Sequence, residues 1–143
     1  MRRRKFCLVT TASHDGVSAR VLQPHPPDAD LGVWFGTSAS SRKIAELRRD
    51  ARATLVYQDD GTAACVVLVG HMELVDAVTV RQRHFMPTWY AFWPEGPTSP
   101  DFVALHFIPY RLEVWDATRG ITPEPFGLRS ACFTRRDGVW GEA

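Results

Sequence analysis

Short segments rich in β-branched and aromatic residues, separated by turn sequences, dominate this chain and leave little room for anything but a sheet. We expect strands over 6–11, 17–23, 31–37, 52–58, 64–75 and 102–115. Asp-Gly at 15–16 and DDGT at 59–62 are hairpin signals between such segments. Six strands with one clear helix predict a mainly β fold, a small and mostly antiparallel barrel. Many strand residues are apolar on both faces, which indicates that the outside of the barrel is also covered.

Several residues interrupt this pattern. Gly70 indicates a bulge or a close approach in the fifth strand, and Pro109 divides the sixth strand into two pieces. The segment after the fifth strand begins as a helix that Pro87 interrupts. Beyond the sixth strand the sequence is polar and irregular, so we expect a loosely held tail over 117–143. The whole chain, 1–143, is expected to form a single domain that includes this tail.

Composition excludes several classes of protein. The 143 residues include 17 basic and 16 acidic ones, a net charge of +1 that argues against a nucleic-acid partner. No apolar run approaches the ~20 residues that span a bilayer, and the apolar run after the basic N-terminus is too short for a signal peptide. The chain has an odd number of cysteines and no C-x-x-C motif; they are Cys7, Cys65 and Cys132. This pattern is typical of free thiols in a reducing compartment. We therefore expect a cytoplasmic protein without a membrane partner.

A helix is predicted over 41–49, and its start has an unusual charge pattern. Arg42 and Lys43 lie in the first turn, although the positive end of the helix dipole disfavours cations there. The preceding serines are N-cap candidates, but no Glu or Gln follows at capping-box spacing. Free N–H groups, hydroxyls and two cations are what a phosphate site requires. The alternative is a solvated helix whose two cations extend into water.

Arg20 lies in the middle of the second strand, between Ala19 and Val21, where an unpaired charge is costly. An arginine in such a position pairs with a carboxylate or a phosphate. Alone, it is most simply explained by a salt bridge to an Asp or Glu at the barrel mouth. Together with Arg42 and Lys43, it favours a phosphate clamp with several arms.

Four segments carry a resemblance to a known family. In chain order they are ARVLQ (19–23), WFGTSASSRKIAEL (34–47), VVLVGHMELVD (66–76) and WYAFWPEGPTSPDFVALHFIPYRLEVWD (89–116). The first three resemble the FMN-binding split-barrel family of pyridoxamine 5′-phosphate oxidase relatives. The fourth is similar to the general stress protein 26 branch of that family. The resemblance implies a six-stranded antiparallel split β-barrel with one or two short helices.

The resemblance also implies a phosphate site. In the family, a strand arginine and an Arg-Lys pair at a helix start hold the flavin phosphate. The matching residues here are Arg20, Arg42 and Lys43, with hydroxyls from Thr37 and Ser41. Each charge-assisted contact contributes about 1.5–3 kcal/mol, so three cations suffice to anchor a dianion.

The flavin ring is assigned to other residues by the same resemblance. Backbone groups of Val21, Leu22 and Gln23 match those that meet the polar edge of the ring. Gly36 lies where the family brings its backbone close to the cofactor. Trp115 matches a tryptophan that reaches the flavin from the partner subunit.

The resemblance therefore implies an FMN-dependent oxidoreductase that forms a homodimer with two flavin sites at its interface. We assign no catalytic residue, because no side chain stands out as an acid, base or nucleophile, and no metal ligands, because the five histidines show no ligand spacing. The substrate is an unknown small molecule. The alternatives are a non-catalytic flavin carrier or stress sensor, a split barrel that binds FAD or a deazaflavin, and a haem-binding relative.

The sequence also departs from the family pattern. The family usually has a helix before the first strand, for which MRRRK offers no counterpart, so either the helix is absent or the assigned start lies too far downstream. Pyridoxamine phosphate oxidases carry a basic, histidine-containing C-terminal motif, whereas this chain has TRRDGVWGEA, which argues against vitamin B6 oxidation. Cys65 stands where the family often has a polar or aromatic residue near the flavin, and the alternative is a small core residue on a strand. The aromatic residues of 89–93 either cover the site or pack in the dimer interface, and we favour the interface.

Overall fold

The structure, a computed structural model, describes residues 1, 4–122 and 128–143. Its eight strands form one antiparallel sheet in the order β2-β1-β4-β5-β6-β7-β8, and β3 pairs with β6 beside this path. The strands are β1 (Cys7–Ser13), β2 (Gly16–Leu22), β3 (Val33–Ser38), β4 (Arg52–Asp59), β5 (Ala64–Val75), β6 (Phe102–Trp115), β7 (Ala131–Arg136) and β8 (Val139–Glu142). The predicted mainly β, antiparallel fold class is confirmed, with two strands more than the six expected.

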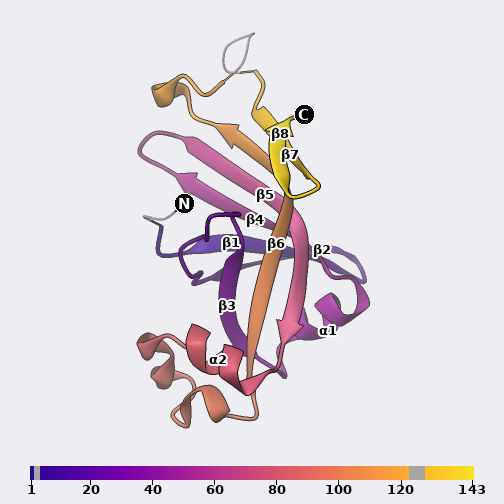
Figure 1. Cartoon of the computed structure of the whole chain (residues 1–143), viewed down its shortest axis with the longest axis vertical. Helices are drawn as coiled ribbons and strands as arrows, with labels where there is room; N and C mark the ends of the chain where they lie inside the picture. Colours follow the sequence, from indigo (N-terminus) through magenta and orange to yellow (C-terminus); the bar gives the residue numbers. More distant parts are fainter. Residues whose placement is uncertain (2–3, 123–127) are drawn as a thin grey trace.

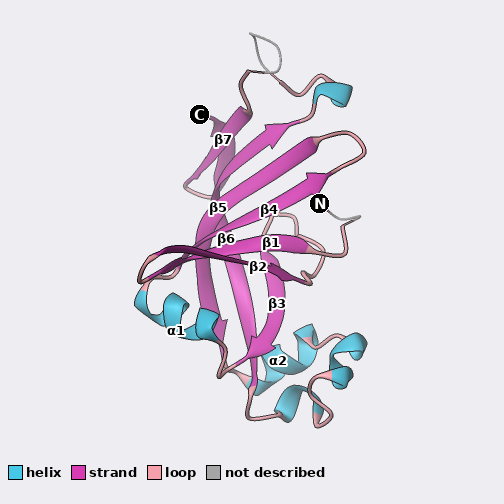
Figure 2. Cartoon of the chain, turned by 180° about the vertical axis from the view of Figure 1, so that it is seen from behind, coloured by secondary structure: helices cyan, strands magenta, loops and turns pink. Residues whose placement is uncertain are grey.

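The helical segments of the chain are short. They are α1 (Arg42–Arg49), α2 (Val78–His84) and three 3-10 turns, η1 (Pro87–Ala91), η2 (Gly96–Thr98) and η3 (Ala117–Arg119). Figure 1 shows α2, η1 and η2 at the end opposite the β7–β8 hairpin and η3 near that hairpin, and Figure 2 shows α1 on the other side of the sheet from α2. None of the helices within the described ranges is long and apolar enough to cross a membrane.

Strand β6 is continuous, so the prediction that Pro109 divides it is wrong. Pro109 pairs with Gly70 of β5 at the point where the β5–β6 register shifts, which confirms the irregularity expected at Gly70. The other edge of β6 pairs with β3 up to Phe107 and with β7 from Arg111 onward. Pro109 lies between these two partners, at a point where no strand pairs with this edge. The N–H that proline lacks is therefore not needed for a hydrogen bond between strands.

The tail expected after the sixth strand is instead partly a hairpin. Strand β7 pairs with β6, and β8 pairs with β7 through a turn in which Asp137 and Gly138 have φ of 51° and 81°. None of the residues of β7 and β8 is fully buried, and the Asp-Gly pair at 137–138 is a hairpin signal that we did not use. The rest of the predicted tail includes η3 and the segment 123–127, which lies outside the described residues.

The core lies between the inner faces of β1, β3, β4, β5 and β6 and the apolar side of α1. Ala53, Leu55 and Tyr57 alternate along β4 with less buried residues and share its buried face. Ile44 and Leu47 anchor α1 to the same core, which is completed chiefly by Val9, Val33, Phe35, Leu68, Met72, Leu105 and Phe107. The helix at the site is therefore fixed by apolar burial rather than by its cap.

We expect Gly70→Ala to lower the free energy of unfolding by about 2 kcal/mol. A Cβ at this position would lie 2.3 Å from the carbonyl oxygen of Ile108 and 2.7 Å from the Phe107 ring, so the β5–β6 bulge would have to shift. The control is Gly141→Ala in β8, where a Cβ meets nothing within 4 Å. Denaturant unfolding curves of both variants measure the effect, and equal stabilities would contradict it.

Candidate functional site

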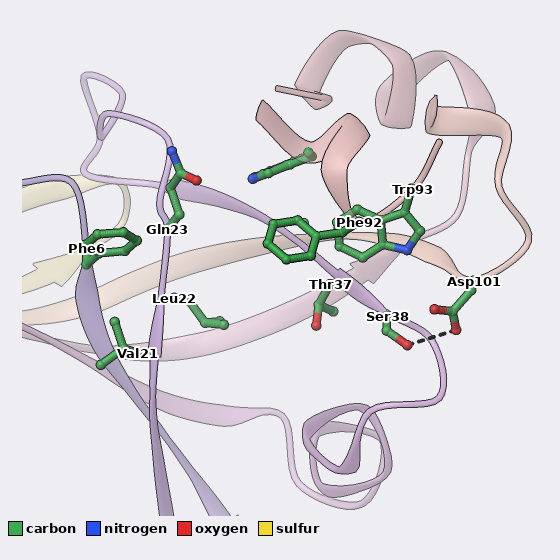
Figure 3. Close-up of a pocket in the computed structure, with 11 residues that line it drawn as sticks. Phe6, Val21, Leu22, Gln23, Thr37, Ser38, Phe92, Trp93 and Asp101 are labelled. Carbon is green, nitrogen blue, oxygen red and sulfur yellow. Dashed lines mark hydrogen bonds between the residues drawn. The ribbon is translucent and has the colours of Figure 1, made fainter. Parts of the chain in front are cut away.

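A cavity of about 440 Å³ lies between β2, β3 and the segment that contains η1. Figure 3 shows Phe6, Val21 and Leu22 toward one end, Trp93, Ser38 and Asp101 toward the other, and Phe92 and Thr37 between them. Gln23, Gly36 and Trp89 complete the lining. A cavity of this size with a mostly apolar wall and a few polar groups has the character of a small-molecule site.

Five residues predicted to bind a cofactor line this cavity: Val21, Leu22, Gln23, Gly36 and Thr37. Among the described strands, β2 pairs only with β1, so its second edge remains unpaired. Backbone N–H and C=O groups on such an edge are free to bond to a ligand. The cavity therefore has one side suited to the polar rim of a flat molecule.

Gly36 has a clear structural role in the wall of the cavity. A Cβ on this residue would lie 2.5 Å from the Trp89 ring and 2.7 Å from the Phe102 ring. Glycine therefore allows Trp89 of η1 to pack directly on β3. The sequence assigned the close approach at Gly36 to a cofactor, whereas in the structure an indole ring also uses that space.

Lys43 connects the start of α1 to the cavity. Its ammonium donates a hydrogen bond of 2.8 Å to the Thr37 hydroxyl, which lines the cavity. Burial and the nearby charge of Arg20 lower the pKa of Lys43, and Glu46 opposes this effect only in part. Two cations held close enough to disfavour each other's charge are a recurrent feature of anion sites.

A buried carboxylate that we did not predict, Glu46, organises the cations. Its side chain is 6% exposed and accepts hydrogen bonds from Thr11 at 2.6 Å and Ser18 at 2.8 Å. Arg20 donates to the same carboxylate at 2.7 Å, and Arg42 lies 3.3 Å from its second oxygen. The barrel-mouth salt bridge that we kept as the simpler explanation of Arg20 is therefore present. A clue was available, because Glu46 is an acid on the buried side of an amphipathic helix, four residues after Arg42.

Glu46 does not cancel the positive charge of the site. Arg20, Arg42, Lys43 and Glu46 together carry a net charge of +2. Burial alone would raise the pKa of Glu46, but hydrogen bonds from Thr11, Ser18 and Arg20 and the charge of Arg20 lower it to about 2. The carboxylate is thus ionised at neutral pH and fixes the orientation of Arg20, whose guanidinium also donates to Thr11 at 2.5 Å. Three of its five N–H donors remain without a partner among the described residues.

Ser41 occupies the N-cap position of α1 but does not cap the helix. Its side chain makes no cap hydrogen bond, and no acidic residue lies in the first turn. Its hydroxyl is buried without a partner among the described residues, which is uncommon for a buried polar atom. The residues just before Ser41 contact Asp101, which accepts hydrogen bonds from the Ser38 hydroxyl at 2.8 Å and the Ser40 N–H at 3.2 Å. Asp101 lines the cavity and is, after Glu46, a second acidic residue that the sequence did not lead us to predict.

Trp115 is the one predicted site residue that the chain does not bring near the others. It lies at the end of β6, 13 residues from Phe102, whose partner Ser38 lines the cavity. This separation corresponds to roughly 40 Å along an extended strand. Cys65 pairs with Trp115 and shares its position. Within one chain, neither residue reaches the cavity.

The aromatic residues beside the site have distinct positions. Trp89, Phe92 and Trp93 line the cavity, whereas Tyr90 does not. Behind this wall, the rings of His84 and His106 stack on Trp34 with centroid distances of 3.9 and 4.2 Å. Two rings so close and parallel to one indole must occupy its opposite faces, since on one face they would overlap. The stack joins α2 to β3 and β6.

Comparison with known proteins places this geometry in context. A family model described as "Pyridoxamine 5′-phosphate oxidase like" matches residues 1–136. None of the curated proteins matches the chain.

Solved structures share the fold at low sequence identity. A Clostridium acetobutylicum protein related to general stress protein 26 of Bacillus subtilis has 20% identity and a TM-score of 0.79, covering 95% of this chain and 89% of that one. An FMN-binding protein from Nostoc punctiforme has 15% identity and a TM-score of 0.71, covering 97% and 86%. PhzG from Burkholderia lata, solved with tetrahydrophenazine-1-carboxylic acid, has 20% identity and a TM-score of 0.72, covering 97% and 80%.

We expect Glu46→Gln to remove a stabilising contribution that depends on pH. The folded-state pKa of about 2 lies below the ordinary 4.5. Ionised Glu46 thus contributes about 3 kcal/mol above pH ~4.5, and this contribution is lost as the pH falls toward 2. The variant should therefore be less stable than the wild type by about this amount at pH 7, and the difference should narrow in acid. Unfolding curves from pH 7 to 2 measure it, with the exposed Asp15→Asn as the control, and a difference that is constant with pH would contradict it.

Proposed function

The chain belongs to the pyridoxamine 5′-phosphate oxidase like family, and we propose that it binds FMN and acts as an oxidoreductase on a small molecule. The observation that carries this proposal is the hydrogen bond from Lys43 to Thr37, which links the start of α1 to the cavity that residues at the unpaired edge of β2 also line. The Nostoc punctiforme relative is itself described as FMN-binding.

The residues present fit such a cofactor. A net charge of +2 from Arg20, Arg42, Lys43 and Glu46 matches a phosphate dianion. The unpartnered Ser41 hydroxyl and the uncapped helix start lie where a phosphate oxygen would accept further hydrogen bonds. The open edge of β2 and the aromatic wall suit a flat ring with polar atoms on one rim. In this proposal Glu46 holds Arg20 in place and leaves its other donors for the ligand.

Bound FMN supplies hydride or electron exchange, and the protein supplies binding, orientation and electrostatics. Lys43, Arg20 and Ser41 would hold the phosphate, and backbone groups at 21–23 would orient the ring. The aromatic side chains of Trp89 and Trp93 would exclude water from one side. We assign no side chain to proton transfer.

We further propose that the active form is a homodimer. The outer face of the sheet carries an apolar row in which Leu8 pairs with Val21 and with Val56, and Val56 pairs with Val67. Val17 and Val21 on this face are 74% and 62% exposed. Such a continuous apolar face is typical of a subunit interface. A second copy would also be the only source of a Trp115 close to the cavity.

The flavin assignment is tested by the charge-reversing double variant Arg42→Glu/Lys43→Glu. It changes the net charge of the four-residue cluster from +2 to −2, so flavin should be lost while the fold is retained. The absorbance of bound flavin per protein, circular dichroism and mass spectrometry of the released ligand are measured. The control is Arg48→Glu/Arg49→Glu, with the same charge change at the other end of α1. Flavin retention at the wild-type level by the first variant would overturn the assignment.

The dimer is tested by Val17→Glu, which places a charge on the apolar face. We expect the dimer to dissociate at least about tenfold more readily, because that charge would be buried without a partner. The matched control is Val139→Glu in β8, since Val139 is 70% exposed and Val17 is 74% exposed. Sedimentation velocity over a range of concentrations measures the dissociation. Equal behaviour of the two variants would show that this face is not the interface.

A further inference from the structure

The rim of the cavity presents aromatic rings to solvent. Phe92 is 74% exposed and Phe6 is 51% exposed, yet both line the cavity. Tyr90, two residues before Phe92, is 53% exposed but does not line the cavity. Exposed rings gathered at the mouth of a cavity form a surface on which a flat apolar molecule can stack.

Charge at the cavity is distributed unevenly. Asp101 is the only residue with a formally charged side chain among the described residues that line it. A hydrogen bond from Ser38 lowers the pKa of Asp101, and burial opposes this only in part, so the carboxylate is ionised at neutral pH. It lies with Trp93 toward one end of the cavity in Figure 3.

The cations near the cavity are already accounted for in the proposed function. Arg20, Arg42 and Lys43 lie around the start of α1, and a flavin phosphate would neutralise the net charge of +2 that they leave after Glu46. The charge that then remains for a second ligand is that of Asp101. A carboxylate there disfavours anions and favours cations.

We propose that the substrate is a flat aromatic molecule, neutral or positively charged, which stacks on Phe92 and is selected against negative charge by Asp101. This inference rests on the proposed flavin site and names the substrate class of that site. This preference against negative charge is the opposite of the one that a phosphorylated pyridine, which is an anion, would need.

Three probes with one ring system test the charge preference: 2-naphthol, 1-naphthylmethylammonium and 2-naphthoate. Each is titrated into the flavin-loaded protein, and the change in the visible absorption of the flavin gives its Kd. We expect 2-naphthoate to bind about tenfold more weakly than 2-naphthol, and the ammonium at least as tightly as 2-naphthol. Asp101→Asn should abolish the discrimination, because it removes the charge but keeps an oxygen that accepts the Ser38 and Ser40 hydrogen bonds. Equal binding of the anion and the neutral probe to the wild type would overturn the proposal.

The stacking role is tested by Phe92→Ala against Tyr90→Ala, two exposed aromatic residues of the same segment. Phe92→Ala should raise the Kd of 2-naphthol about fivefold, whereas Tyr90→Ala should leave it unchanged. Both variants are saturated with FMN before the titration, which separates the loss of a stacking surface from the loss of the cofactor. Equal effects of the two variants would overturn the stacking role.

Failure of the proposed function gives a different result. A protein that retains no flavin after incubation with excess FMN contradicts the flavin site. The same three probes are then titrated by quenching of tryptophan fluorescence, since Trp89 and Trp93 line the cavity. In that experiment, a preference for the neutral or cationic probe that Asp101→Asn removes supports the substrate class. If that preference is absent, the proposed substrate class is overturned.

Discussion

The change of partner along β6 is the constraint on which the rest of the molecule depends. Up to Phe107 the outer edge of this strand pairs with β3, and from Arg111 onward it pairs with β7, with Pro109 between them. The paired irregularity at Gly70 lets β5 follow β6 through this point. Because β3 is held beside the first half of β6, its C-terminal end lies next to the segment that supplies the aromatic wall. The cavity is thus a result of how one strand divides its edge between two neighbours.

Electrostatics at the helix start follow a second constraint, the burial of a carboxylate. A buried ion is tolerated only when its hydrogen-bonding capacity is met, and Glu46 meets it with two hydroxyls and two arginines. Glu46 reduces the positive charge of the site by one unit, and it also determines where Arg20 points. Glu46 compensates the charge of Lys43 only in part, and the hydrogen bond of the Lys43 ammonium goes to the neutral Thr37 hydroxyl. The site is therefore a positioned cation beside an undercompensated one.

Local patterns predicted the elements, but not what joins them. Alternation and Asp-Gly turns located the first five strands closely, because burial of one face and turn chemistry are both written in neighbouring residues. The β7–β8 hairpin was missed, although its turn contains the same Asp-Gly signal, because its two short strands have no fully buried face to indicate them. Glu46 and Asp101 were missed because the partners that define their roles, Arg20 and Ser38, lie 26 and 63 positions away in the chain. Arg20, by contrast, stood out as a charge in an apolar strand, and its position alone required a partner.

The packing of the Trp89 ring against Gly36 limits how a molecule can reach the cavity. This ring is 4% exposed and lies against β3 and Phe102. Lifting it would expose about 150–250 Å² of apolar surface, at a cost of about 4–6 kcal/mol. The Trp89 ring therefore belongs to the cooperative unit of the folded core, and it does not act as a hinged flap over the cavity. A ligand must therefore enter and leave the cavity on its solvent-facing side, beside Phe6 and Phe92. The rate of ligand exchange is then set by the width of that opening rather than by the rate of an opening motion.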